Sequence, residues 1–135
     1  MPRDKNTILI IDDDPDVIEI VKISLERAGY SVVSASNGAE GFKQAKSVQP
    51  DLIILDVLMP RQDGLTTFEE LKNDPGSALI PVVLLTSVNA RLGFGLSSDD
   101  LAVHTGKGPE AFLEKPVDAS VLLRTVAKIL SSDNG

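Results

Sequence analysis

The chain has 135 residues, of which 42% are hydrophobic and 24% are charged. This length suits one domain with its own core, and the composition argues against wholesale disorder and a fibrous repeat. Because there is no cysteine, a disulfide framework, a thiolate metal site and a cysteine nucleophile are excluded. The 20 acidic and 13 basic side chains give a net charge of −7, which disfavours direct nucleic-acid binding.

The N-terminal apolar run, Ile8 to Ile11, is too short for a signal sequence or a membrane span. We therefore expect a cytoplasmic protein without membrane insertion. No segment repeats another, and residues 131–135 are expected to form a frayed tail. The chain is predicted to be a single domain over residues 1–135.

Five apolar segments have the length of strands. Most are rich in Ile, Val and Leu without strict polar alternation, which is typical of a parallel sheet covered on both faces. The predicted strands are Thr7 to Ile11, Tyr30 to Ala35, Leu52 to Leu55, Val82 to Leu85 and the weaker Ala111 to Leu113.

Helical segments alternate with these strands. Asp14 before Pro15 is typical of a helix N-terminus, so we interpret Asp14 as an N-cap and not as a metal ligand, and Gly29 ends this helix. The remaining helices are predicted over Gly38 to Val48, over Leu65 to Asn73, and from the N-cap Asp118 onwards. The alternation predicts a doubly wound α/β domain with a five-stranded parallel sheet.

Polar side chains follow the predicted strands at their carboxyl ends, which lie along one edge of a parallel sheet. These side chains are Asp12, Asp13, Asp56, Thr86 and Lys115. Carboxylates this close repel one another by roughly a few kcal/mol per pair, so a cation is expected among them. Hard oxygen ligands suit Mg²⁺ or Mn²⁺. With an ammonium and a hydroxyl nearby, the cluster predicts a pocket for a phosphoryl group that an aspartate can attack.

Four segments, in this order, resemble the motifs of response-regulator receiver domains. They are Ile8 to Pro15, Pro50 to Pro60 with Asp63-Gly64, Pro81 to Ser87, and Phe112 to Pro116. The resemblance covers nearly the whole chain and implies the flavodoxin-like (βα)5 receiver fold. It also implies that Asp56 accepts a phosphoryl group from a phosphohistidine on a sensor histidine kinase.

The resemblance further implies a role for each site residue. The ligands of the Mg²⁺ (or Mn²⁺) would be Asp12, Asp13, Asp56 and the carbonyl of Leu58. Thr86 and Lys115 would bind the phosphoryl oxygens. Phe112 would be an aromatic switch residue that moves inward when Thr86 is drawn to the phosphate.

Two features depart from the family pattern. The segment between Thr86 and Lys115 is longer than usual and glycine-rich, which predicts an atypically short fourth helix over Ser98 to His104. This change puts the family's usual dimer face in doubt. In addition, Leu58 and Val88 stand where receivers often carry polar side chains that admit water, so slow dephosphorylation is expected.

The function predicted from these residues is that of a stand-alone receiver, which catalyses only its own phosphorylation and dephosphorylation. Its partners would be a sensor histidine kinase and either a downstream protein target or a histidine phosphotransfer protein. Two alternatives stay open: a small phosphohydrolase of the haloacid-dehalogenase type with Asp12 as nucleophile, and a degenerate receiver that serves as a docking module.

Overall fold

The computed structural model describes residues 6–57, 64–86, 110–115 and 117–134. The carbonyl of Leu58, the side chain of Val88 and the helix predicted over Ser98 to His104 lie outside these residues. The described strands are β1 (Thr7–Ile11), β2 (Ser31–Ala35), β3 (Leu52–Asp56), β4 (Val82–Thr86) and β5 (Ala111–Glu114). The described helices are α1 (Pro15–Arg27), α2 (Gly38–Val48), α3 (Gly64–Asn73) and α5 (Ala119–Asn134).

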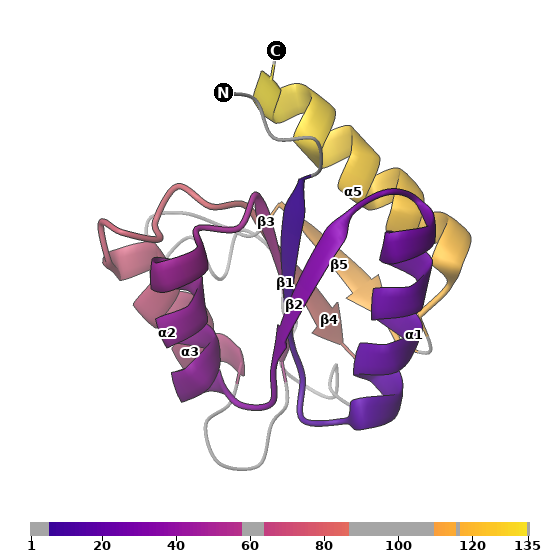
Figure 1. The fold of residues 1–135 in the computed structure, drawn as a ribbon. Coiled ribbons are helices and arrows are strands. Elements are labelled where there is room, and N and C mark those ends of the chain that lie inside the picture. The colour runs from indigo at the N-terminus through magenta and orange to yellow at the C-terminus, as the bar shows by residue number, and fades with distance from the viewer. Residues whose placement is uncertain (1–5, 58–63, 87–109, 116, 135) are drawn as a thin grey trace.

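The five strands form one parallel sheet in the order β2-β1-β3-β4-β5. Helices α1 and α5 cover one face of this sheet, and α2 and α3 cover the other (Figure 1). The predicted doubly wound α/β fold is therefore confirmed. None of the helices in the described part of the chain is long and apolar enough to cross a membrane.

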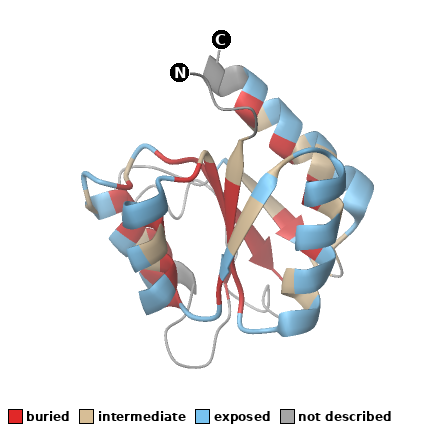
Figure 2. Ribbon diagram, in the orientation of Figure 1, coloured by how far each residue is buried: buried red, intermediate tan, exposed pale blue. Residues whose placement is uncertain are grey.

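The central strands are buried on both faces, as Figure 2 shows for the middle of the sheet. In β1, Leu9 and Ile11 pack towards α2 and α3, whereas Ile8 and Ile10 pack towards α1 and α5. Both sets are fully buried, which explains why these strands show no polar alternation.

The ends of helix α1 follow the predicted local chemistry. Asp14 is the N-cap, and its side-chain Oδ1 accepts a hydrogen bond of 2.9 Å from the backbone N–H of Asp16. Beyond the helix, Gly29 has a φ of 99°, a left-handed conformation that glycine adopts without a steric penalty. These two ends fix where the chain leaves β1 and where it re-enters the sheet at β2.

Helix α5 reaches into residues 131–135, for which the sequence predicts a frayed tail. Helix α5 continues to Asn134, so most of this segment is helical. The physical reason is that a helix propagates cheaply once its earlier turns have formed. Those turns are anchored by Leu122, Val126 and Leu130, which are buried against the sheet.

Gly41 lets α2 approach β1 closely. A Cβ atom at Gly41 would overlap the side chain of Ile11, whose Cγ1 would lie 2.7 Å away. Alanine normally stabilises a helix by about 1 kcal/mol relative to glycine. We nevertheless expect Gly41→Ala to lower the free energy of unfolding by roughly 1–3 kcal/mol, because it overpacks the core.

Urea unfolding checks this prediction, with Ser47→Ala on the exposed side of α2 as the control. That control is expected to stay within about 0.5 kcal/mol of the wild type. A Gly41→Ala variant that is more stable than the wild type would show that Ile11 repacks without cost.

Candidate functional site

Three carboxylates meet at the carboxyl ends of β1 and β3. The two strands are neighbours, with Ile11 opposite Leu55, so Asp12 and Asp56 follow this pair side by side. One carboxylate oxygen from each of Asp12, Asp13 and Asp56 lies within 4.8 Å of the others. Asp12 is completely buried and Asp56 is 4% exposed, whereas Asp13 is exposed. The cluster therefore reaches solvent on the side of Asp13.

Lys115 places a positive charge inside this cluster. Its Nζ lies 3.1 Å from Oδ2 of Asp12 and 3.3 Å from Oδ1 of Asp56. Its backbone N–H donates a hydrogen bond of 2.7 Å to the carbonyl of Thr86, which ties the end of β5 to the end of β4. The sequence predicts a cation and the ammonium of Lys115 at this edge, and in the structure Lys115 neutralises part of the carboxylate charge.

The surroundings of Lys115 keep it protonated. Burial by itself lowers the pKa of the ammonium, but its contacts with Asp12 and Asp56 outweigh burial and raise the pKa above the ordinary value of 10.5. Since the folded-state pKa is the higher one, the stabilisation is fully present below pH 10.5. It is lost only as the pH rises through the folded-state pKa. Lys115 therefore carries its charge at neutral pH.

Asp12 is held by the backbone on both sides. Its N–H donates to the carbonyl of Ala35 at 3.1 Å, and its Oδ1 accepts from the N–H of Asp14 at 2.9 Å. Its Oδ2 is fully buried and accepts no hydrogen bond from the described residues, so the ion pair with Lys115 offsets its charge. A buried oxygen with spare acceptor capacity, beside two further carboxylates, fits a hard divalent cation such as Mg²⁺ or Mn²⁺.

Thr86 lies at the same edge as the carboxylates, and Phe112 lies two residues before the end of the neighbouring strand β5. Thr86 is the last residue of β4, is 5% exposed, and stands opposite Glu114 of β5. Phe112 stands opposite Leu84, is partly buried, and packs against the core on the α2 and α3 side. A change at Thr86 therefore has a short path to Phe112, through the paired strands β4 and β5.

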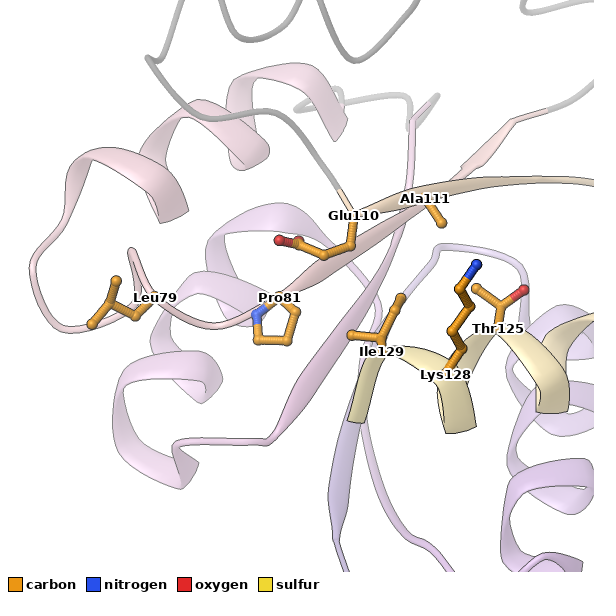
Figure 3. Close-up of a pocket in the computed structure, with 7 residues that line it drawn as sticks. All are labelled: Leu79, Pro81, Glu110, Ala111, Thr125, Lys128 and Ile129. Atoms are coloured by element: carbon orange, nitrogen blue, oxygen red, sulfur yellow. The ribbon is translucent and has the colours of Figure 1, made fainter. Parts of the chain in front are cut away.

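A hollow lies at the opposite ends of the strands. It has a volume of about 460 Å³ and is lined by Leu79, Pro81, Glu110, Ala111, Thr125, Lys128 and Ile129 (Figure 3). In it, Oε1 of Glu110 accepts a hydrogen bond of 2.8 Å from the N–H of Val82, the first residue of β4. Because the carboxylate cluster follows the last residues of the strands, this hollow is not part of the candidate site.

The sequence places Asp12, Asp56 and Lys115 at this edge, but it does not show the backbone contact that orients Asp12. Asp14 was interpreted as a helix cap, yet its N–H also donates to the side chain of Asp12. The Asp-x-Asp spacing carries this information, because an aspartate side chain often accepts from the N–H two residues later.

Comparison with known proteins places the chain among signalling domains. The family model described as the response regulator receiver domain matches residues 8–127. RpaA of Synechocystis sp., a "DNA-binding dual master transcriptional regulator", is 39% identical over 130 residues, which are 96% of this chain and 49% of RpaA. Protein PilH of Pseudomonas aeruginosa is 31% identical over 124 residues, 92% of this chain and 97% of PilH.

A solved structure of a receiver domain is also similar to this chain. The signal receiver domain of a signal transduction histidine kinase from Syntrophus aciditrophicus has a TM-score of 0.76 and 37% identity. The match covers 94% of this chain and 91% of that one. Among the curated relatives, the chain thus spans about half of RpaA but nearly all of PilH.

Proposed function

Because the chain belongs to the response-regulator receiver family of two-component signalling, we propose that Asp56 accepts a phosphoryl group from a sensor histidine kinase, with Mg²⁺ or Mn²⁺ as cofactor. One observation carries this proposal. The Asp56 carboxylate lies within 4.8 Å of the carboxylates of Asp12 and Asp13, and its Oδ1 is 3.3 Å from the ammonium of Lys115.

The cation would be held by the carboxylates of Asp12, Asp13 and Asp56, with the Leu58 carbonyl as a further ligand. When bound, it supplies positive charge that lets one anion approach another. A carboxylate oxygen of Asp56 forms the new bond to phosphorus, while the bond from phosphorus to the histidine nitrogen of the kinase breaks. Lys115, protonated at neutral pH, and the hydroxyl of Thr86 bind the phosphoryl oxygens.

The output of this reaction would be a changed protein-binding surface or transfer of the phosphoryl group to a histidine phosphotransfer protein. Phe112 supports the first of these outputs, because it is partly buried beside a hollow of about 310 Å³ that Val117 and Val121 also line. A shift of the ring would reshape that surface. We propose that the domain works in the cytoplasm. We also propose that it does not contact nucleic acid directly, since its net charge is −7.

The phosphohydrolase alternative is not favoured by the environment of Asp12. That mechanism needs Asp12 to attack a phosphate ester, but the side chain is completely buried and both of its oxygens are engaged by Asp14 or Lys115. Asp12 would have to leave these contacts before it could reach a substrate.

Phosphorylation by a small donor tests the proposal. The protein is incubated with acetyl phosphate and Mg²⁺, and added phosphate is located by intact mass and peptide mapping. We expect one phosphoryl group on the peptide that contains Asp56, and none on the Asp56→Asn variant. Turnover of phosphate monoesters that depends on Asp12 would favour the hydrolase, and an unlabelled wild type would favour a docking module.

The lifetime of the phosphorylated form is expected to be long. Leu58 and Val88 are apolar and stand at positions where receivers often carry polar side chains that admit attacking water, so in-line hydrolysis is expected to be slow. Replacing Leu58 with Asn and Val88 with Glu is therefore expected to shorten the half-life of the phosphorylated form. The decay of the phosphorylated mass after donor removal measures it, and an unchanged or longer half-life would contradict the prediction.

A further inference from the structure

A chain of contacts links the first turn of helix α1 to the phosphoacceptor. The N–H of Asp16 donates to Oδ1 of Asp14, and the N–H of Asp14 donates to Oδ1 of Asp12, both at 2.9 Å. The other oxygen of Asp12 pairs with Lys115 at 3.1 Å, and Lys115 reaches Asp56 at 3.3 Å. Asp14, whose side chain caps the helix, thus donates its backbone N–H directly to a buried carboxylate of the candidate metal site.

We propose that Asp14 is a positioning residue for metal binding, which acts on the cation through Asp12 and not as a ligand. The side chain of Asp14 caps α1 and so holds its own backbone in an extended conformation, with φ −96° and ψ 111°. In that conformation its N–H points at Oδ1 of Asp12. This donor helps to fix the orientation of the Asp12 carboxylate, whose Oδ2 lies 3.1 Å from Nζ of Lys115.

The alternative explanation for any effect of Asp14 is its charge. Asp14 is exposed and acidic, so removing it also lowers the negative potential that attracts a cation. Asparagine separates the two explanations, because it caps helices as well as aspartate does but carries no charge. Asp16 offers a matched control: it is exposed and acidic on the same helix turn, and only its backbone N–H takes part in the chain of contacts.

The inference rests on the proposed function, because it concerns the cation that would serve Asp56. Its test is the affinity of the full chain for Mn²⁺, measured by electron paramagnetic resonance. The proteins compared are the wild type, Asp14→Ala, Asp14→Asn and Asp16→Asn. Urea unfolding without metal is measured in parallel for each variant. We expect Asp14→Ala to weaken Mn²⁺ binding roughly tenfold, at the low end of what outer partners of metal ligands contribute.

Asp14→Asn and Asp16→Asn are expected to bind Mn²⁺ within about threefold of the wild type, since they keep the cap and the N–H donor. Equal losses in Asp14→Ala and Asp14→Asn would overturn the inference in favour of charge. If Asp14→Ala lowered the free energy of unfolding but left the Mn²⁺ affinity unchanged, the inference would be wrong and Asp14 would act only as a helix cap. If the wild type itself bound no Mn²⁺, the proposed function would fail together with the inference.

Discussion

The Lys115→Met variant is expected to bind Mg²⁺ more tightly than the wild type and yet to accept a phosphoryl group far more slowly. In the protein without metal, the ammonium lies 3.1 Å from Asp12 and 3.3 Å from Asp56, so a divalent cation must share these carboxylates with it. Removing the competing charge should tighten Mg²⁺ binding at least tenfold, since charges a few ångströms apart interact by a few kcal/mol and about 1.4 kcal/mol is a factor of ten.

The same substitution removes the cation that would bind the transferring phosphoryl group. Loss of one such charged donor typically slows a reaction by roughly a hundredfold or more. Calorimetry with Mg²⁺ and a time course of intact mass with acetyl phosphate measure the two effects separately. Lys128→Met is the control, because Lys128 is exposed and lies at the hollow at the other ends of the strands. Weaker Mg²⁺ binding by Lys115→Met would mean that Lys115 organises the carboxylates and does not compete for them.

Replacing both Asp12 and Asp13 with Asn is expected to abolish Mg²⁺ binding and phosphorylation together. Two of the three carboxylates within 4.8 Å of one another would lose their charge, and neutral amides are weak ligands for a hard cation. The fold should survive, because asparagine retains a side-chain oxygen that can accept the N–H of Asp14 at position 12.

Calorimetry with Mg²⁺ and phosphorylation by acetyl phosphate check this double variant. Its control is a second doubly neutralised protein, Glu19→Gln with Glu26→Gln, in which two exposed acids of α1 lose the same charge. The control is expected to keep both Mg²⁺ binding and phosphorylation. If the double Asn variant still accepted phosphate at the wild-type rate, phosphorylation of Asp56 would not depend on the metal site.

The fold could be predicted because its central strands, β1, β3 and β4, are buried on both faces. Runs such as Leu52 to Leu55 and Val82 to Leu85 are apolar without interruption, and the structure buries every one of these side chains. Local chemistry predicted the start and the end of α1, since Asp14 caps the helix and Gly29 takes a positive φ. The frayed tail expected over residues 131–135 stays a prediction, and α5 extends to Asn134.

The candidate site could be predicted only at the level of strand ends. Asp12, Asp56 and Thr86 were placed at one edge because parallel strands end on the same side. Lys115 lies between two carboxylates because of the register of β5 against β4 and because of side-chain rotamers. No local sequence pattern encodes either of these. The roles of these residues in metal binding and phosphoryl transfer, and the single-domain organisation, stay predictions.

The most direct test of the central claim is the intact mass of the wild-type protein after incubation with acetyl phosphate, with Mg²⁺ in one sample and excess EDTA in the other. We predict one added phosphoryl group in the Mg²⁺ sample, carried by Asp56, and none with EDTA. Equal labelling in the two samples, or labelling that persists in Asp56→Asn, would contradict the account.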